Sequence, residues 1–224
     1  MKKKVLGVIV ARGGSVRLPN KNLLKIGRYT LLEHAIREAK KSKFIDTLIC
    51  STDDTRIRSN AVKNGCSVPQ LRPKYLASNI ASTKDLMTYI CKKSDYHDYV
   101  VLIQPTSPLR IAQDIDKALR LCHRKKAYSV VSVTQSIKKA SWTYYLANNN
   151  KLEKCFNNKK NENEKNLYTL NGAVYILRFE NVIKNYSFIN KDTVAYTMPL
   201  ERSIDIDTKL DLEIAKLLYN KKHI

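Results

Sequence analysis

The sequence lacks the cysteine pattern and the long apolar run that mark two large classes of protein. Its five cysteines, at positions 50, 66, 91, 122 and 155, are an odd number and form no Cys-x-x-Cys pair. This argues against both a disulfide framework and a zinc site. No stretch approaches the ~20 consecutive apolar residues that a membrane-spanning helix needs. We therefore expect neither a disulfide-stabilised secreted domain nor a membrane protein.

Acidic residues are also few. Lys and Arg number 41 against 20 Asp and Glu, which gives a formal net charge of +21 over 224 residues. Such an excess is common in nucleic-acid-binding proteins, but here the lysines are scattered and form no long tract of like charges. We expect no nucleic-acid partner. The basic bias would still attract a polyanionic nucleotide.

The chain length and a hydrophobic content of 43% suit one domain with a substantial core. Lys2–Lys4 followed by the apolar run Val5–Ala11 superficially resembles a signal peptide. However, the run is short, no small-residue cleavage site follows it, and Arg12 ends it at once. We interpret the run as a buried first strand and expect a cytoplasmic protein.

Alternating strand and helix patterns predict an α/β fold. Val5–Ala11, Tyr99–Gln104 and Tyr128–Val133 are continuous apolar runs, typical of parallel strands covered on both faces. Further strands are expected at Thr47–Cys50 and Asn171–Leu177, and helices at Asp54–Lys63, around Leu31–Ala39, around Ile111–Cys122 and around Leu210–Leu218. This order implies right-handed βαβ units, with ligands bound outside the carboxyl ends of the strands.

Residues 136–170 differ in texture from the rest. They are polar and rich in asparagine, as at Asn148–Asn150 and Asn157–Asn166, with short strand-like pieces at Trp142–Leu146 and Leu152–Phe156. We expect a single domain over residues 1–224, within which residues 136–170 form an extension that serves as a dimerisation arm or a substrate lid.

The loop after the first strand has the chemistry of a phosphate site. It runs from Ala11 to Asn22, and its spacing matches neither the dinucleotide turn nor the Walker A loop. Gly13 and Gly14 would let backbone N–H groups approach an anion closely. Cations come from Arg12, Arg17 and Lys21. An ordinary basic surface turn is an equal alternative from these residues alone.

A late pair of aspartates has the chemistry of a metal site. In an extended strand over Ser203–Thr208, Asp205 and Asp207 would share one face while the intervening isoleucines enter the core. Neighbouring carboxylates repel unless a cation lies between them, and together with phosphate oxygens they suit Mg²⁺. From the residues alone, capping of the following helix by Asp207 or Thr208 is an equal alternative.

These segments resemble the CMP-acylneuraminate synthetase (cytidylyltransferase) family. The matching motifs, in family order over Val5 to about Lys216, are Ala11-Arg12-Gly13-Gly14-Ser15, Arg17-Leu18-Pro19, Lys21-Asn22, Ser51-Thr52-Asp53-Asp54, Leu71-Arg72-Pro73, Leu76-Ala77-Ser78, Ala81-Ser82-Thr83, Gln104-Pro105-Thr106-Ser107-Pro108-Leu109-Arg110, Asn171-Gly172-Ala173-Val174-Tyr175-Ile176 and Ser203-Ile204-Asp205-Ile206-Asp207-Thr208. The resemblance implies a three-layer, Rossmann-like nucleotidyltransferase fold with a mostly parallel sheet and a small dimerisation extension. It also implies CTP and an acidic 2-keto sugar as substrates, Mg²⁺ or Mn²⁺ as cofactor, and a homodimer.

The resemblance assigns roles to individual residues. Nucleotide binding falls to Arg12, Gly13, Gly14, Ser15, Lys21, Asn22, Arg72, Ala81 and Ser82. Sugar binding falls to Gln104, Thr106, Ser107, Asn171 and Tyr175. Arg12, Lys21 and Asp207 would be catalytic, and Asp205 and Asp207 would hold the metal. The residues alone leave alternatives open, because Ser82 also fits a helix cap with Asp85 and a strand tyrosine such as Tyr175 is more often part of the core. The segment Gln104–Arg110, taken by itself, favours a plain proline turn.

Three positions depart from the family pattern. Val16 stands where the phosphate loop usually carries Lys, Thr169 stands where an arginine often precedes the Asn-Gly-Ala strand, and Asn79 replaces a usual Asp. They weaken N-acetylneuraminic acid as substrate more than they weaken the reaction, which leaves legionaminic and pseudaminic acid open. The alternatives are a CMP-Kdo synthetase or another sugar nucleotidyltransferase and, in a different class, a non-catalytic basic nucleotide- or RNA-binding protein.

Overall fold

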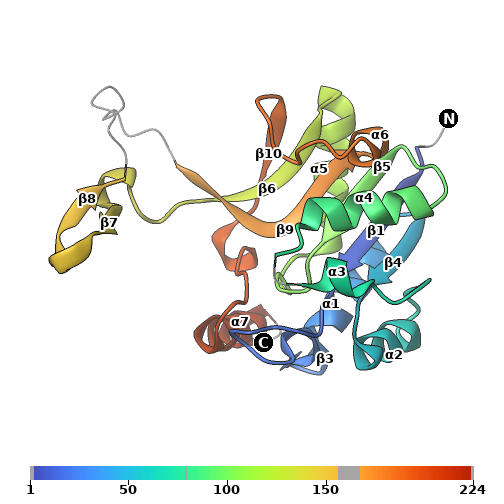
Figure 1. The fold of residues 1–224 in the computed structure, drawn as a ribbon, viewed down its shortest axis with the longest axis horizontal. Coiled ribbons are helices and arrows are strands. Elements are labelled where there is room, and N and C mark those ends of the chain that lie inside the picture. Colours follow the sequence, from blue (N-terminus) through green and yellow to red (C-terminus); the bar gives the residue numbers. More distant parts are fainter. Residues whose placement is uncertain (1–2, 79, 156–166, 223–224) are drawn as a thin grey trace.

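The computed structural model describes residues 3–78, 80–155 and 167–222. Its body is built on a six-stranded sheet in the order β10-β6-β9-β5-β1-β4 (Figure 1). The strands are β1 Val5–Val10, β4 Thr47–Ser51, β5 Tyr99–Ile103, β6 Ser129–Gln135, β9 Tyr168–Arg178 and β10 Thr193–Thr197. All neighbours pair in parallel except β9, which runs antiparallel to β5 and β6. The predicted mostly parallel α/β sheet is confirmed.

Three helices cover one face of this sheet, namely α1 Leu31–Lys41, α2 Thr55–Lys63 and α5 Ala112–Lys125. Their apolar stripes share one buried cluster with β1, β5 and β9. A capping box fixes the start of α1, because the Thr30 hydroxyl accepts from the Glu33 N–H and the Glu33 carboxylate accepts from the Thr30 N–H. The helices therefore begin where the sequence pattern predicts.

A second helical layer covers the other face. It consists of α4 Thr83–Lys93 with the shorter α3 Lys74–Ala77 and α6 Phe179–Ile183. Leu86, Met87 and Ile90 of α4 pack with Phe179 and Val182 of α6 in a separate buried cluster. The body is thus the three-layer arrangement that the family resemblance implies.

A third, smaller core lies where the amino-terminal loop meets the end of the chain. Here the 3₁₀ turn η1 Lys21–Leu23 and the two-stranded β2 Lys25–Ile26 and β3 Tyr29–Thr30 approach α7 Lys209–Lys222. Ile26, Leu109, Ile206 and Leu212 are buried together. This cluster joins three segments that are far apart in the sequence.

The predicted strand over Ser203–Thr208 is wrong. Residues 203–207 have no strand or helix assignment, and the Ile206 N–H donates to the Thr106 carbonyl at 2.8 Å. Thr208 caps α7, because its hydroxyl accepts from the Asp211 N–H at 3.3 Å and the Asp211 carboxylate accepts from the Thr208 N–H at 2.7 Å. The Asp207 carboxylate is therefore not used as the helix cap.

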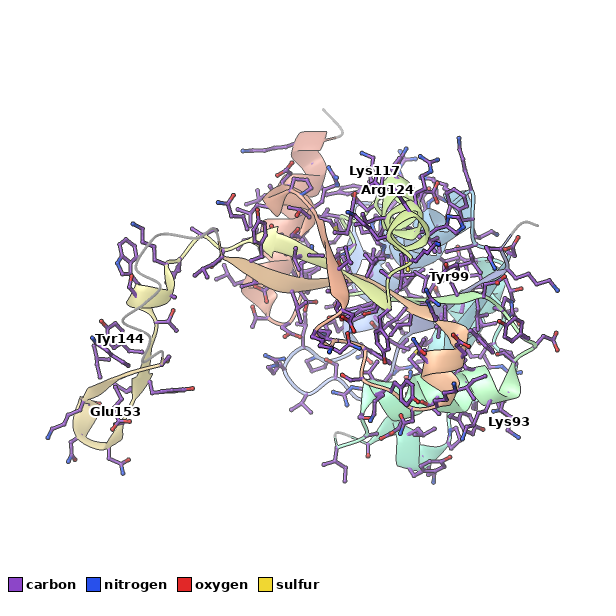
Figure 2. The ribbon with its side chains drawn as sticks, turned by 90° about the horizontal axis from the view of Figure 1, so that it is seen from above. Lys93, Tyr99, Lys117, Arg124, Tyr144 and Glu153 are labelled. Atoms are coloured by element: carbon purple, nitrogen blue, oxygen red, sulfur yellow. The ribbon has the colours of Figure 1, made fainter. Side chains whose placement is uncertain are left out.

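The extension within residues 136–170 stands away from the body (Figure 1). Its described part contains η2 Ala140–Trp142, β7 Tyr144–Leu146, η3 Asn148–Asn150 and β8 Leu152–Lys154. Strands β7 and β8 form an antiparallel hairpin, from which Tyr144 and Glu153 project in Figure 2. The polar stretch Asn157–Asn166 lies outside the described residues. We refer to residues 140–154 as the arm.

Basic residues occur on both helical layers. Lys117 and Arg124 lie on α5, whereas Lys93 ends α4 on the other face of the sheet (Figure 2).

In the described ranges, no helix has both the length and the apolar character needed to cross a membrane. The remaining element, η4 Leu200–Arg202, leads from β10 toward the aspartate segment.

Candidate active site

A cleft of about 380 Å³ lies beyond the carboxyl ends of β1 and β5, where ligands bind in open α/β sheets. The predicted site residues on its walls are Arg12, Ser15, Lys21, Asn22, Arg72, Ala81, Ser82, Gln104, Thr106, Asp205 and Asp207. Val10, Leu76 and Leu86 add apolar surface. Segments from both ends and from the middle of the chain therefore meet around one cavity.

Two polar side chains fix the glycine loop. The Gly13 N–H donates to Asp53 Oδ1 at 3.0 Å, and Asn22 Nδ2 donates to the Arg12 carbonyl at 2.9 Å. A Cβ at Gly13 would lie 2.8 Å from the Cβ of Asp54, so only glycine permits this packing. The Gly13 N–H, which we expected to face an anion, is thus bonded to a carboxylate. Gly13 and Gly14 border an adjoining open depression with Asp53 and Asp54 instead of lining the cleft.

A carboxylate organises the cations of the loop. Lys21 Nζ lies 2.8 Å from Asp207 Oδ1, and Arg17 Nη2 lies 2.6 Å from Asp207 Oδ2. The hydrogen bond from Lys21, followed by the charges of Lys21 and Arg17, lowers the pKa of Asp207. Lys21 is 13% exposed and Arg17 is 68% exposed. Lys21 is therefore held inside the cleft, whereas Arg17 reaches Asp207 from outside.

Arg72 forms a buried cationic part of the cleft wall. Its Nη2 donates to the Ser51 carbonyl at 2.6 Å and its Nε to Ser51 Oγ at 3.2 Å. Burial lowers the pKa of Arg72, and the charge of Asp53 opposes that shift. These contacts fix the guanidinium at the end of β4. Ala81 and the apolar Leu76 and Leu86 line the cleft beside it.

Ser82 occupies the cleft wall and a helix terminus at once. Its hydroxyl accepts from the Asp85 N–H at 3.0 Å and donates to Asp85 Oδ2 at 2.6 Å. This caps α4. The capping prediction for Ser82 is confirmed. The same residue also lines the cleft.

Asp205 and Asp207 lie on the same side of the cleft. Asp205 keeps access to solvent there, but the protein packed around it raises its pKa, and the charge of Asp207 raises it further against a hydrogen bond from Thr106. In the described part of the chain, no three His, Cys, Asp or Glu side chains gather as a metal cage. Two carboxylates suit Mg²⁺ where phosphate oxygens and water supply its other ligands. The donor set fits such an ion.

Ser107 and Asn171 do not lie on the cleft wall. Both are buried, and their polar groups bond to protein. Asn171 Nδ2 donates to Ser203 Oγ at 2.9 Å, while Asn171 Oδ1 accepts from Ser132 Oγ at 2.6 Å. Ser107 Oγ donates to the Asn171 carbonyl at 3.3 Å. These residues, expected to contact the sugar, lie behind the wall and brace it.

Tyr175 is the remaining predicted residue that is absent from the cleft lining. It is half-buried in β9 and packs against the core beneath α4 and α6. Burial raises its pKa, and the charge of Asp205 adds to this shift. The side chain is therefore electrostatically coupled to Asp205 but belongs to the core packing.

Sequence reasoning missed the importance of Gly172 and Arg110. Gly172 has φ +70°, and a Cβ there would lie 2.8 Å from Gln104 Oε1 and 3.3 Å from Asp205 Oδ2. A glycine within a strand pattern signals a bulge, and the register of β6 with β9 does shift beside it. Arg110 is fully buried. No local pattern reveals this, since an arginine after a proline turn is normally exposed.

Comparisons with known proteins agree with this geometry. The model of the cytidylyltransferase family matches residues 6–224. The CMP-N,N'-diacetyllegionaminic acid synthase of Legionella pneumophila is 35% identical over 223 residues, which are 96% of each chain. The N-acylneuraminate cytidylyltransferase of Escherichia coli is 33% identical over all of this chain and 54% of its own. A solved CMP:2-keto-3-deoxy-manno-octonic acid synthetase complexed with CTP shares the fold, with a TM-score of 0.75, 17% identity and coverage of 98% and 99%. The chain therefore belongs to the cytidylyltransferase family.

Proposed function

We propose that this enzyme transfers CMP from CTP to the anomeric hydroxyl of a nonulosonic acid and releases pyrophosphate. The observation that carries the proposal is the convergence of basic residues and two aspartates on one cleft. Family membership sets the reaction class. The printed activities of the Legionella and Escherichia relatives, on diacetyllegionaminic and N-acylneuraminic acid, set the class of acceptor.

CTP binds with its phosphates on the basic side of the cleft. Arg12 and Lys21 hold the phosphate oxygens, and a polyanion competes with Asp207 for Lys21 and Arg17 because all bind through charge-assisted hydrogen bonds. The cytidine lies toward Arg72, Ala81 and Ser82, with Ser15 and Asn22 beside it. Polar groups held in fixed positions at the cytidine end of the cleft favour the nucleotide base that can form hydrogen bonds with all of them.

Asp205 and Asp207 would hold a magnesium or manganese ion against the triphosphate. That ion supplies charge neutralisation at the α-phosphate and favours ionisation of the attacking hydroxyl. The raised pKa of Asp205 and the repulsion between its carboxylate and that of Asp207 support the assignment, since a bound cation would lower that pKa and offset the repulsion. If phosphates take over Lys21 and Arg17, the Asp207 oxygens that these cations now occupy become free to bind the ion.

The acceptor sugar lies against Gln104 and Thr106, which line the cleft beside Asp205. Its anomeric hydroxyl attacks the α-phosphorus in line with the departing pyrophosphate. No side chain is assigned as a general base, because transfers of this kind depend mainly on positioning and charge neutralisation. The turn Gln104–Thr106 therefore orients the nucleophile.

The test is pyrophosphate release from CTP with a panel of acceptors. The panel contains N-acetylneuraminic, legionaminic, pseudaminic and 2-keto-3-deoxy-manno-octonic acid, each with and without Mg²⁺. We expect release with at least one nonulosonic acid, CTP preferred over ATP, GTP and UTP, and loss of activity with EDTA. Turnover with 2-keto-3-deoxy-manno-octonic acid alone would identify the enzyme as a CMP-Kdo synthetase instead. Salt-sensitive RNA binding without any pyrophosphate release would establish the non-catalytic alternative.

The arm supports a homodimer. A two-stranded hairpin is at best marginally stable alone in water, and all residues of β7 and β8 are exposed in the single chain. Trp142, Leu146 and Leu152 are 67–70% exposed in the single chain and present apolar surface to solvent. A second copy of the chain covers this surface.

A further inference from the structure

A buried arginine lies directly behind the acceptor side of the cleft. Arg110 is 1% exposed, and its Nε is the buried side-chain nitrogen that finds no hydrogen-bond partner among the described residues. Burial lowers the pKa of Arg110 to about 10, so the guanidinium remains charged at neutral pH. Burying a charge without a directly bonded counter-ion is costly. The charges of Glu38 and Asp114 offset part of that cost, and the direct contacts of Arg110 are with backbone carbonyls.

The guanidinium bridges two segments of the cleft wall. Arg110 Nη1 donates to the carbonyl of Gln104, which follows β5, and to the carbonyl of Ala173 on β9, each at 3.1 Å. The bond from Ser107 to the Asn171 carbonyl lies beside this bridge. Together they fasten the turn Gln104–Arg110 to the bulge at Gly172.

This bulge separates two residues of the candidate site. The position of a Cβ on Gly172 is within 2.8 Å of Gln104 Oε1 and within 3.3 Å of Asp205 Oδ2. The backbone of Gly172 thus lies against the acceptor-side glutamine and against the candidate metal ligand. A shift of the bulge by a few tenths of an ångström would move one relative to the other.

We propose that Arg110 is a positioning residue that sets the spacing between Gln104 and Asp205. It acts through the two carbonyls and touches neither substrate. The proposal rests on the proposed function, in which Gln104 contacts the acceptor and Asp205 would hold the ion that binds the phosphates. Misplacement of reacting groups by about 1 Å lowers rates by about 10²-fold, so a spacing residue has a large effect on turnover without contacting the chemistry.

The test compares Arg110→Met and Arg110→Lys with Arg178→Met. Arg178 is a matched control because it also donates to two carbonyls, those of Lys126 and Ala127, but at the far end of β9. For Arg110→Met we expect the acceptor kcat/KM to fall about 10- to 100-fold, with the KM for CTP little changed. Arg110→Lys keeps the charge and one carbonyl contact and should restore part of the loss. Arg178→Met should keep both the acceptor kcat/KM and the KM for CTP.

Crystal structures of the same variants separate this proposal from the proposed function. In Arg110→Met the distance between Gln104 and Asp205 should change, and in Arg178→Met it should not. Unchanged spacing with unchanged kinetics overturns the positioning role while leaving the cytidylyltransfer intact. If the wild type turned over no acceptor, the proposed function would fail. The distance between Gln104 and Asp205 in the variant crystal structures would then be the test of whether Arg110 positions these two residues. If Arg110→Met does not fold, Arg110→Lys carries both readouts.

Discussion

The body and the arm treat their apolar side chains in opposite ways. In the body, the sheet and its helices bury large residues in three clusters. In the arm, Trp142 and Leu146 are each 70% exposed and Leu152 is 67% exposed. Burial of apolar area is the main stabilising term in folding, so the body is stable by itself and the arm is not. We therefore propose that the body carries the chemistry and that the arm mediates assembly.

The largest effect should come from a body residue that leaves assembly unchanged. Asp207→Ala removes the carboxylate that bonds Lys21 and Arg17 and that we propose holds the metal. We expect kcat to fall by at least about 10²-fold, the usual scale for losing one preorganised electrostatic contact. Steady-state pyrophosphate release measures this, and sedimentation should show the wild-type association state.

A second carboxylate close to Asp207 in the sequence provides a control for the loss of one negative charge. Glu213→Ala on α7 also removes an ion-paired carboxylate, 2.9 Å from Lys216, but does not line the cleft. It should retain full turnover. Equal activity of Asp207→Ala and Glu213→Ala with Mg²⁺ present would reject the metal assignment.

The converse effect should come from the arm. Leu146 and Leu152 are cross-strand partners in the hairpin, and changing both to Ser removes apolar surface that the second copy would cover. We expect the dimer dissociation constant to rise at least about 10-fold, with little change in thermal unfolding of the body because both side chains are exposed in the single chain. Sedimentation equilibrium and calorimetry measure the two quantities.

The control for the arm is an exposed apolar residue of the body. Val62 on α2 is 56% exposed, and Val62→Ser should leave association unchanged. A monomeric wild type, or an arm variant that associates as tightly as the wild type, would contradict the assignment of assembly to the arm.

Much of the fold is predictable because buried parallel strands have a continuous apolar pattern. The runs at β1 and β5 identify themselves in this way, and Ser82 marks a helix start that the structure confirms. Edge strand β10 was missed because its burial is mixed and its pattern weak. The antiparallel direction of β9 is set by where the chain returns after the arm, which no local pattern records.

The candidate site was predictable by residue and less so by orientation. Arg12, Lys21 and Asp207 line the same cleft, and their catalytic roles stay predictions. Asn171 and Ser107 face other polar groups instead, because a sequence shows that a side chain can hydrogen-bond but not which partner it has. The strand expected around Asp205 failed for a related reason, since alternation alone cannot tell a sheet strand from an extended segment.

A smaller effect should distinguish the cleft wall from the rest of the body. Gly172 and Gly65 have φ +70° and +71°, and an added Cβ at each meets the end of a flexible side chain, Gln104 or Lys40. Each change to Ala should lower the free energy of unfolding by about 1–2 kcal/mol, measured by urea denaturation. Only Gly172→Ala should also raise the acceptor KM, because it displaces Gln104. An unchanged acceptor KM would mean that the bulge does not shape the site.

The smallest effect concerns the exposed tip of the glycine loop, where Val16 is 74% exposed. Val16→Lys adds a cation near the expected phosphates, and we expect the KM for CTP to fall about 2- to 5-fold, since an exposed charge acts through screened, high-dielectric solvent. Val62→Lys makes the same change of charge on α2 and should leave that KM unaltered, which separates a local contact from a change in net charge. Kinetics at low and high salt should show the gain shrinking as ionic strength rises. An unchanged or higher KM for Val16→Lys would show that this loop does not hold the nucleotide. The assignment of the triphosphate to the basic side of the cleft would then be rejected.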